Sequence, residues 1–367
     1  MGRKTIIPFG PQHPVLPEPI HLDLVIEDEV VVQAIPSIGY VHRGLEKLVE
    51  KREYTEMVYV IERTCGICSF GHGWGYCAAV EGLFDVEIPR RAEYLRTIWE
   101  ELSRLHSHLL WLGLYADAFG FESLFMHCWR LRETILDIFE KTTGGRVIFS
   151  VCKVGGVRKD IDNETLKEIA EILKKMKAEI KEVTDVFIED KSVKNRTVGV
   201  GVLTKEDAIK LGAVGPMARG SGVVQDMRLI GYGAYGDLTF EPVIETSGDC
   251  WARACVRIRE LFQSIDLIDE AVLKIPDGDI AVPVKGTIPE GDFMVRIEQP
   301  RGEAYYYAKG VGTRFKGAGS KFLHRMRVRT PTNQNIPALV KMLQGCDLAD
   351  VPTLVLTIDP CVSCTER

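Results

Sequence analysis

The longest regular pattern in the chain reads PRRAEYLRTIWEELSRLHSHLLWL over residues 89–112. Its apolar residues recur at intervals of three and four, at Leu95, Ile98, Leu102, Leu105, Leu109 and Leu112. This period places one apolar stripe along one face of a helix. Pro89 stands just before the first turn, where a helix tolerates proline. The stretch therefore predicts one long amphipathic helix.

Three further stripes with the same period follow at residues 124–138, 166–187 and 254–272. The first is closed by Gly144 and Gly145, and the second lies behind Asp162 or Asn163, either of which can cap a helix. Lysines and glutamates fill the outer face of that second stripe, so its helix is expected to be half exposed. Four long helices imply a bundle as the core.

Short β segments are expected on both sides of these helices. Leu22, Leu24 and Ile26, followed by Val30 and Val32, alternate with polar residues and predict a hairpin with one face buried. Strands are also predicted at residues 293–297 and 305–307. A last strand is predicted through Leu354, Leu356 and Ile358, and it would lead into Cys361.

These elements predict a mainly α fold with small β parts, in the α+β class. No internal repeat or low-complexity linker divides the sequence, so we expect one compact domain over residues 1–367. Its expected parts are an N-terminal β and loop region (1–60), a helical core (61–280), and β pieces with a C-terminal metal-ligand segment (281–367).

The composition is that of a folded protein, with 46% of the 367 residues apolar and 27% charged. A net charge of -6 gives no general reason to bind nucleic acid, and the basic run at residues 321–329 is interpreted as a solvated face. Prolines interrupt the first twenty residues, so no secretory signal is expected, and no stretch suits a transmembrane helix. Ten cysteines without such a signal fit a reducing compartment.

Two Cys-x-x-Cys pairs, Cys65 with Cys68 and Cys361 with Cys364, stand near opposite ends of the chain. Each pair can place both sulfurs on one metal, so together they offer a thiolate site for nickel, zinc or iron. Zinc ribbons usually hold their pairs about 15–20 residues apart, so structural zinc is one alternative beside an iron–sulfur cluster or another metal. The other six cysteines are expected to be buried apolar residues: Cys77, Cys128, Cys152, Cys250, Cys255 and Cys346.

Two residues beside the first pair strengthen the interpretation as a functional metal site. Arg63 precedes Cys65 by two residues, and His72 follows Cys68 by four. A guanidinium and an imidazole can both hydrogen-bond to sulfurs or to diatomic ligands of a metal. Such neighbours also lower thiol pKa values, which favours the thiolate form that binds metals.

The motifs around these cysteines resemble the large subunit of nickel-iron hydrogenases. They are RTCGIC at 63–68 with His72, PRG at 300–302 and DPCVSC at 359–364. Two loops, GPQHP at 10–14 and GYVHRGLEK at 39–47, resemble the 49 kDa subunit of respiratory complex I. The combination is similar to the energy-converting, membrane-associated (Ech-like, group 4) hydrogenases, and the resemblance implies the fold that these subunits share.

The resemblance implies a nickel-iron centre whose iron carries carbon monoxide and cyanide. Nickel would be held by all four cysteines, with Cys68 and Cys364 bridging to the iron and Cys65 and Cys361 terminal. Splitting dihydrogen requires a Lewis acid and a nearby base, and Cys361 is the candidate base.

The resemblance also assigns roles around the metals. Arg301 would stand over the open position between them, and Asp359 would hold Arg301 in place. Pro300 and Thr332 would touch the cyanides, whereas Arg63 and His72 would line the cofactor.

Two departures from the better-known uptake hydrogenases affect this assignment. Their N-terminal Arg-x-Glu-Gly-His is absent, and residues 17–19 occupy its position, so Glu18 is the candidate proton relay, with an ordinary loop carboxylate as the alternative. Their terminal histidine is replaced by Arg367, which cannot bind a cation. A second site for magnesium or iron at Glu46 therefore competes with an ion pair between Glu46 and Arg367.

The implied function is that of the catalytic subunit of an energy-converting nickel-iron hydrogenase, which interconverts H2 with protons and electrons. No second cysteine cluster could hold an electron relay, so we expect a small partner subunit with a 4Fe-4S cluster. Further iron-sulfur and membrane-arm subunits, ferredoxin and ion translocation are implied by the resemblance, as is a peripheral place on the cytoplasmic side of the membrane. The alternatives are a non-catalytic coupling or quinone-site subunit of complex I type and a zinc-stapled scaffold.

Overall fold

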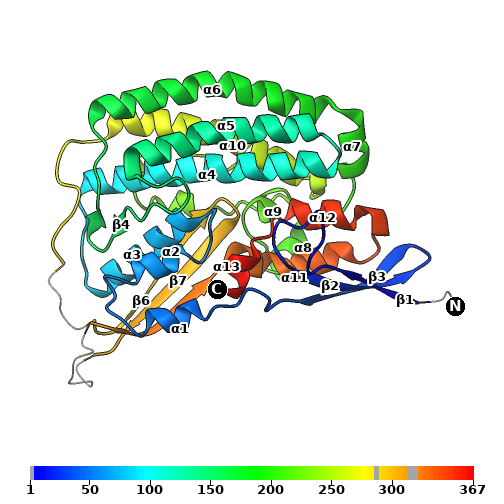
Figure 1. Cartoon of the computed structure of the whole chain (residues 1–367), viewed down its shortest axis with the longest axis horizontal. Helices are drawn as coiled ribbons and strands as arrows, with labels where there is room; N and C mark the ends of the chain where they lie inside the picture. The colour runs from blue at the N-terminus through cyan, green and yellow to red at the C-terminus, as the bar shows by residue number, and fades with distance from the viewer. Residues whose placement is uncertain (1–3, 285–288, 313–320) are drawn as a thin grey trace.

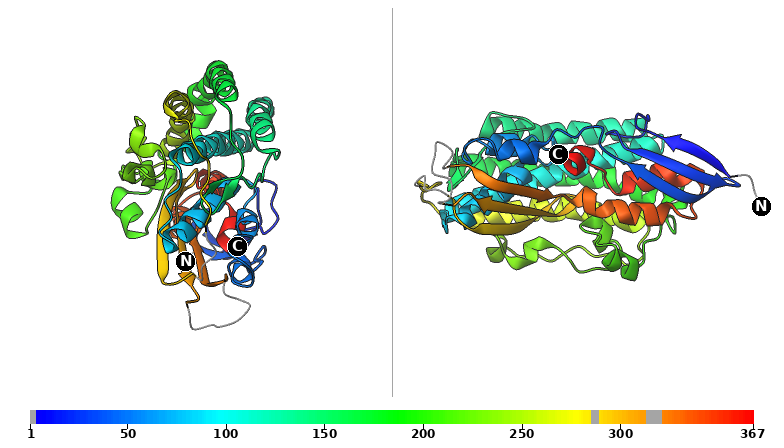
Figure 2. Two further views of the ribbon diagram at one scale, coloured as in Figure 1. Left: turned by 90° about the vertical axis from the view of Figure 1, so that its left-hand side faces the viewer. Right: turned by 90° about the horizontal axis from the view of Figure 1, so that it is seen from below.

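The computed structural model describes residues 4–284, 289–312 and 321–367. Four long helices form one layer, and shorter helices with a three-stranded sheet form a second layer beneath it (Figure 1). Another three-stranded sheet lies at the end of the molecule that carries the N-terminus, and the C-terminal helices lie between the two sheets (Figure 1, Figure 2). Segments from both ends of the sequence therefore meet in the second layer.

The layer of long helices confirms the four predicted stripes. It consists of α4 (Arg90–Ala118), α5 (Glu122–Thr143), α6 (Asn163–Glu189) and α10 (Cys250–Lys274). Asp162 caps α6 by accepting a hydrogen bond from the Thr165 N–H, and Gly144 ends α5 in the left-handed conformation at φ 87°. Helix α4 is buried around most of its circumference, whereas α6 buries one stripe and exposes its charged face, as expected.

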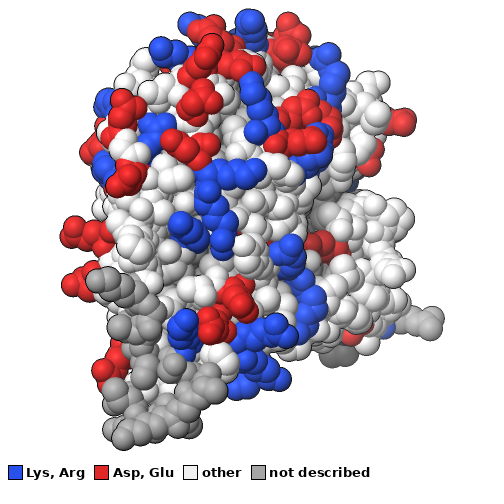
Figure 3. All heavy atoms as spheres, turned by 60° about the vertical axis from the view of Figure 1, so that its left-hand side comes forward, with Lys and Arg blue, Asp and Glu red and all other residues white. Residues whose placement is uncertain are grey.

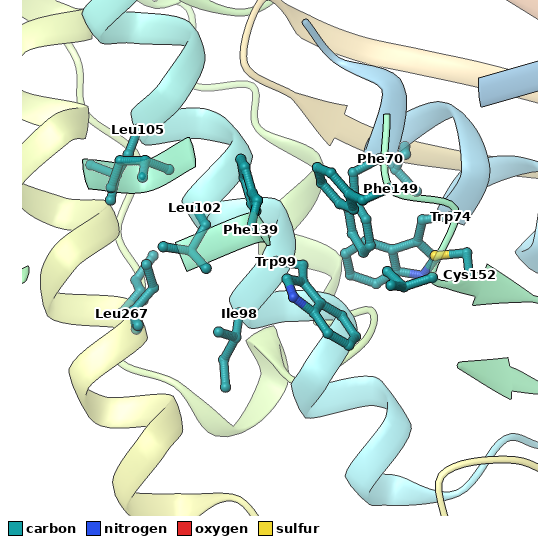
Figure 4. Packing of buried hydrophobic residues seen from close by; sticks show 14 of the residues in the cluster. Phe70, Trp74, Ile98, Trp99, Leu102, Leu105, Phe139, Phe149, Cys152 and Leu267 are labelled. Atoms are coloured by element: carbon teal, nitrogen blue, oxygen red, sulfur yellow. The ribbon is translucent and has the colours of Figure 1, made fainter. Parts of the chain in front are cut away.

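Aromatic side chains connect the bundle core to the second layer (Figure 4). Leu102 of α4 and Leu267 of α10 lie in one apolar cluster between the long helices. Phe139 of α5 stacks on Phe149 with ring centroids 4.4 Å apart, and Phe149 stacks on Phe70 at 5.7 Å. Each such buried side chain contributes about 1.5–3 kcal/mol through the hydrophobic effect, so the two layers form one continuous core.

Helix α3 (Ser69–Leu83) lies between the bundle and the sheet, and the sequence analysis did not predict it. Its glycines weaken the helical signal, because glycine has a low helix propensity. The structure shows why they are needed: a Cβ on Gly75 would stand 2.2 Å from the ring of Tyr306, and one on Gly82 would stand 2.2 Å from the ring of Phe293. Glycine thus allows α3 to lie directly on the sheet.

That sheet is antiparallel with the order β6-β7-β8. Its strands are β6 (Asp292–Gln299), β7 (Gly302–Gly310) and β8 (Leu323–Arg329). The first two confirm the predicted strands. Strand β8 was not predicted, because the basic residues obscured its alternation: Met326 and Val328 are buried, whereas Arg327 and Arg329 are exposed. The basic run is thus the solvated outer face of a strand.

The N-terminal sheet has the antiparallel order β1-β2-β3. Its strands are β1 (Thr5–Phe9), β2 (His21–Glu27) and β3 (Val30–Ser37), and β2 with β3 confirm the predicted hairpin. The buried face of β3 was predicted wrongly, since Val31 and Ala34 are buried and Val32 is exposed. The register shifts between Val25 and Ile26, and such a bulge moves the side chains of one strand to the opposite face.

The predicted strand through Leu354, Leu356 and Ile358 is wrong, because residues Val351–Thr357 form helix α12. Nearly every residue of α12 is buried, so its leucines do not mark one face, and a short apolar run of this kind fits a strand or a buried helix equally well. Helices α11 (Pro331–Leu343) and α13 (Val362–Glu366) flank it, so residues 281–367 contain helices as well as β pieces.

The remaining elements are short and join these layers. The helices are α1 (Leu45–Val49), α2 (Val58–Glu62), α7 (Lys191–Thr197), α8 (Lys205–Lys210) and α9 (Pro216–Arg219), and there are 3-10 turns at Met227–Ile230, Tyr235–Asp237 and Leu348–Asp350. A two-stranded ribbon pairs β4 (Cys152–Lys153) with β5 (Gly156–Val157). Among the described residues, no helix is both long enough and apolar enough to span a bilayer.

The outer surface of the helical layer is charged but mixed in sign. On the face shown in Figure 3, acidic and basic side chains intermingle over this layer. Ion pairs such as Lys141 with Glu168 join neighbouring helices α5 and α6. Exposed pairs of this kind contribute roughly 0–1 kcal/mol each, so the bundle depends mainly on its apolar core.

Candidate metal centre

The four cysteines of the two Cys-x-x-Cys pairs meet in one buried cluster. Their sulfur atoms all lie within 4.8 Å of one another, although 296 residues separate Cys65 from Cys361. The Sγ atoms of Cys65 and Cys361 are 3.3 Å apart, and those of Cys68 and Cys364 are also 3.3 Å apart. Each side chain is at most 2% exposed. The cluster is thus sealed from solvent and composed of sulfur alone.

Local backbone geometry positions each pair. Cys68 precedes the first turn of α3, and Cys361 precedes the first turn of α13. The backbone N–H groups of Ile67 and Cys68 point at the Cys65 sulfur at 3.2 and 3.4 Å. Hydrogen bonds from the neighbouring cysteines hold the pKa of Cys68 well below its ordinary value, whereas burial raises that of Cys364. These two thiols therefore differ in proton affinity, and a bound cation would displace the protons that remain.

Arg43 joins the two cysteine segments. Its guanidinium donates to the carbonyl oxygens of Arg63 at 2.8 Å and Thr64 at 2.9 Å, and to that of Ser363 at 3.2 Å. One side chain thus connects the N-terminal pair to the C-terminal pair. Arg43 lies in the 39–47 loop that resembles the complex I subunit, and its sequence position predicted no role at the cysteines.

Arg301 lies in the turn between β6 and β7, beside the buried Pro300. Its Nε donates to the Asp359 carbonyl at 2.9 Å, one terminal nitrogen to the Asp359 carboxylate at 2.8 Å, and the other to the Ser107 hydroxyl at 3.2 Å. Burial opposes its charge, but Asp359 and the nearby cysteines raise the pKa of Arg301 well above its ordinary value. A fixed cation therefore stands beside the sulfur cluster.

A close backbone contact fixes this turn. Gly302 has a φ of 131°, and a Cβ there would lie 2.7 Å from the backbone nitrogen of Gly215. The two chain segments can approach only because both residues are glycines. The position of Arg301 is therefore set by backbone packing as well as by Asp359.

His72 of α3 contacts the cluster directly. Its Nε2 lies 3.3 Å from the Cys364 sulfur, and its Nδ1 lies 2.8 Å from the hydroxyl of Tyr306. Gln299 in turn donates to the Tyr306 hydroxyl at 2.9 Å. The predicted neighbour is therefore in place, whereas Tyr306 and Gln299 were missed because nothing in their local sequence connects them to a cysteine.

Glu18 and Thr332 both contact the C-terminal pair. Glu18 accepts hydrogen bonds from the backbone N–H and the hydroxyl of Ser363, each at 2.8 Å, and its carboxylate lies 4.0 Å from the Cys361 sulfur. The Thr332 hydroxyl accepts from the Cys361 N–H at 3.0 Å. The N-terminal loop thus places the half-exposed side chain of Glu18 between the cluster and solvent.

The expectation that Arg63 contacts the sulfurs is not met. Its side chain is exposed and donates to the carbonyl oxygen of Tyr59 at 2.6 Å. Arg63 lies at the end of α2, where the helical turn directs its side chain outward while Cys65 points inward. Sequence proximity to a cysteine thus did not imply proximity in space.

Glu46 does not offer a free carboxylate to a second cation. It accepts from Arg367 Nε at 2.8 Å, from Arg327 at 3.0 Å and from the Val328 N–H at 2.9 Å. Burial would raise its pKa, but these hydrogen bonds lower it below its ordinary value. The adjoining surface cavity of about 410 Å³ is also lined by Lys47 and Arg325. These residues do not fit a magnesium or iron site, and the alternative pairing with Arg367 is observed.

Two protein families match parts of this chain. Residues 118–288 and 283–367 match the family described as respiratory-chain NADH dehydrogenase, 49 Kd subunit, and residues 43–116 match nickel-dependent hydrogenase. The chain is 38% identical to membrane-bound hydrogenase subunit alpha of Pyrococcus furiosus, over 98% of this chain and 87% of that protein.

Two other relatives are similar to this chain over nearly their whole length. A subunit of the F(420)H(2) dehydrogenase of Methanosarcina mazei is 37% identical over 100% of this chain and 98% of its own length. The carbon monoxide-induced hydrogenase of Rhodospirillum rubrum is 37% identical over 98% of this chain and 99% of its own length. Similar chains therefore include both hydrogenases and a dehydrogenase.

Proposed function

Since the chain belongs to the family that unites the large subunits of energy-converting nickel-iron hydrogenases with the 49 kDa subunit of complex I, we propose that it is the catalytic subunit of such a hydrogenase. The reaction is H2 = 2 H+ + 2 e-. The observation that carries the proposal is the buried cluster of four cysteine sulfurs. A subunit that only couples or binds quinone has no use for that cluster.

The donor set fits the nickel-iron centre of this family. Two thiolates on one metal at roughly 2.3 Å lie at most about 4.6 Å apart, close to the 4.8 Å span of the cluster. Cys68 and Cys364, which would bridge nickel and iron, lie side by side, and so do Cys65 and Cys361, which would be terminal. Carbon monoxide and cyanide on the iron would lie near Pro300 and Thr332. When bound, this centre supplies the Lewis acid that polarises H2.

The residues around the cluster have distinct roles in this proposal. Arg301, fixed by Asp359, holds a positive charge beside the metals without contributing a ligand. Heterolytic cleavage releases a proton. The Cys361 thiolate is the proposed base, because it lies beside the Glu18 carboxylate, through which the proton can leave the site. Glu18 takes this proton over the 4.0 Å gap and passes it outward through the loop. His72 hydrogen-bonds to the sulfur of Cys364, one of the residues that would hold the centre.

The electrons must leave through another subunit. Within the described ranges, the four cysteines are the one group of three or more metal-ligating side chains that lie close enough to share an ion. We therefore propose a small partner subunit with a 4Fe-4S cluster, within a complex that contains further iron-sulfur and membrane-arm subunits. Ferredoxin as the final electron carrier, coupling to ion translocation and peripheral attachment to the cytoplasmic face of the membrane belong to the same proposal.

The second candidate is a non-catalytic subunit of complex I type. The larger family match, over residues 118–367, favours it because its description names the 49 Kd subunit. The loops at 10–14 and 39–47 would then form the functional surface. This candidate leaves four buried thiols and a buried arginine at one site without a purpose, so we rank it second.

Infrared spectroscopy with metal analysis separates these candidates. The protein is purified anaerobically with its partner subunits, beside two variants, Cys361→Ser and Cys128→Ser. Cys128 is an equally buried cysteine outside the cluster. We expect carbonyl and cyanide stretching bands together with bound nickel in the wild type and in C128S, and loss of these bands in C361S. Iron should exceed nickel in the wild type, because the partner subunits contribute iron-sulfur clusters. Zinc without such bands would support the structural scaffold, and bands that survive C361S would contradict the assigned ligand.

A further inference from the structure

A buried carboxyl group, that of Glu100, lies near the residues that contact His72 Nδ1, and it has no role in the reaction described above. Glu100 of α4 is 1% exposed, and neither of its carboxyl oxygens has a hydrogen-bond partner among the described residues. Gln299 is equally buried, and its Oε1 likewise has no partner in the described part of the chain. Native proteins rarely leave buried polar atoms in this condition.

These two groups lie around the same point of the backbone. A Cβ on Gly71 would stand 3.0 Å from the Gln299 nitrogen Nε2 and 3.3 Å from the Glu100 oxygen Oε2. Both side chains therefore converge on the same glycine. An ionised Glu100 would leave its two oxygens and the acceptor Oε1 of Gln299 all without a donor, whereas a neutral carboxyl has an O–H to donate.

From Gln299, an unbroken chain of hydrogen bonds reaches the sulfur cluster. Gln299 Nε2 donates to the Tyr306 hydroxyl at 2.9 Å, and that hydroxyl lies 2.8 Å from His72 Nδ1. The other acceptor within reach of Tyr306, the Gly71 carbonyl, is farther away at 3.5 Å. The hydroxyl has one hydrogen to donate, and Nδ1 is the nearer of its two acceptors. With this hydrogen on Nδ1, the imidazole proton resides on Nε2, 3.3 Å from the Cys364 sulfur.

We propose that Glu100, in its neutral form, is a positioning residue at the inner end of the chain Glu100–Gln299–Tyr306–His72, which directs the His72 Nε2–H at the Cys364 sulfur. Glu100 donates to Gln299 Oε1 and so fixes the orientation of the amide. The amide fixes the Tyr306 hydroxyl, and the hydroxyl fixes the tautomer of His72. The consequence for catalysis rests on the proposed function, but the chain itself does not.

The charged surroundings of Glu100 are compatible with a neutral carboxyl. Burial raises its pKa well above the ordinary value, and the charges of Glu101 and Cys68 act in the same direction. Arg104 and Arg228 act in the opposite direction and do not outweigh them. Besides Cys68 and Arg228, three groups on other elements lie within the influence of Glu100: a negative charge on it would raise the pKa values of Cys152, Tyr232 and Tyr306.

The first test detects the proton on Glu100. Infrared difference spectra are recorded at neutral pH between the metal-free wild-type chain and Glu100→Gln, which has nearly the same shape. We expect a protonated-carboxyl C=O band that is lost in E100Q. Its absence from the wild type would overturn the proposal.

The second test measures the tautomer of His72 in the metal-free full chain labelled with 15N-histidine. Long-range 1H–15N correlation spectra report which ring nitrogen carries the proton, and His72→Gln assigns the signal. We expect the Nε2–H form in the wild type and in E100Q, whose amide retains a donor. We expect loss of this single form in Glu100→Met and in Tyr306→Phe.

Tyr76→Phe is the matched control, because Tyr76 is as buried as Tyr306 but donates to the Tyr54 carbonyl instead. A His72 signal that is unchanged in E100M, or changed equally in Y76F, would refute the role of Glu100. If E100M does not fold, the infrared band and the effect of Y306F still decide the proposal. Both readouts use metal-free protein, so they stand or fail independently of hydrogenase activity.

Discussion

Replacing Glu260 with glutamine should destabilise the protein by about 3 kcal/mol, because Glu260 lies at the centre of a buried ionic network. Its carboxylate accepts two hydrogen bonds from Arg219, at 3.1 and 2.7 Å, and one from His108 at 2.8 Å. Burial lowers the pKa of His108 to about 4, so it donates as a neutral imidazole at pH 7. All three side chains are inaccessible to solvent.

The magnitude follows from these contacts. A hydrogen bond to a charged partner contributes about 1 kcal/mol more than a neutral one, and Glu260→Gln neutralises the acceptor of three. Breaking a buried ion pair outright costs about 3–5 kcal/mol, but Arg219 keeps Glu298 at 2.8 Å and Asp226 at 3.0 Å. With an unfolding entropy of about 2.1 cal/mol/K per residue, a loss of 3 kcal/mol lowers the Tm of a 367-residue chain by roughly 4 °C.

The pH dependence provides a second check. Burial would raise the pKa of Glu260, but Arg219, His108 and Arg228 together hold it well below its ordinary value. A carboxylate of this kind stabilises the folded state above its unfolded pKa, and that contribution is lost as the pH falls through the folded pKa. The difference in Tm between wild type and E260Q should therefore be largest above the ordinary glutamate pKa of 4.5 and should shrink as the pH falls below it.

Thermal unfolding followed by circular dichroism measures this difference. The matched control is Glu168→Gln, which removes a carboxylate from an exposed pair with Lys141 and should change the Tm by about 1 °C or less. An E260Q variant that melts within 1 °C of the wild type would refute the reasoning. The network also bears on the site, since Glu298 and Gln299 precede the turn that carries Arg301.

Three further predictions concern the metal centre. Glu18→Gln retains an oxygen that accepts from Ser363 but cannot take up a proton, so H2 evolution should fall about 100-fold or more with unchanged nickel content; activity within threefold of the wild type would remove Glu18 from the proton path. Arg301→Lys keeps the charge but loses the planar fork that contacts Asp359 and Ser107, so kcat should fall about 100-fold while the infrared bands remain; loss of the bands would instead indicate a role in assembly. Arg43→Met should lower the retained nickel after gel filtration, because it separates the two cysteine segments, whereas the control Arg63→Met should not; equal losses in both variants would contradict the contacts assigned to Arg43.

Much of the fold was readable from the sequence because the long helices repeat one apolar stripe over many turns. The stripes of α4, α5, α6 and α10 are long enough that single exceptions do not obscure the period. Helices α3 and α12 were not recognised because tertiary contacts override their local signals. Glycines in α3 serve the close approach to Tyr306, and burial on all sides removes any amphipathic pattern from α12.

The residues of the site also fall into two groups, those that local sequence predicts and those that it does not. The cysteines, His72, Arg301 and Asp359 could be predicted because short motifs specify them. Arg63 shows the limit of that reasoning, since a residue two positions from Cys65 can point in the opposite direction. Arg43 and Tyr306 could not be predicted, because their partners lie in distant segments and only the folded chain brings them together.

The contacts that hold the cysteine segments together are made mostly to the backbone and not to the sulfur atoms. Arg43 binds three carbonyl oxygens, Thr332 accepts from the Cys361 N–H, and Glu18 accepts from the Ser363 N–H. Exchanging the sulfurs for other small side chains would leave each of these hydrogen bonds intact. This framework of backbone hydrogen bonds can therefore persist when the metal chemistry is lost. Its persistence explains in physical terms how one family can unite hydrogenases with subunits of other oxidoreductases. It follows that the four sulfurs, and not the frame around them, carry the assignment of this chain to hydrogen chemistry.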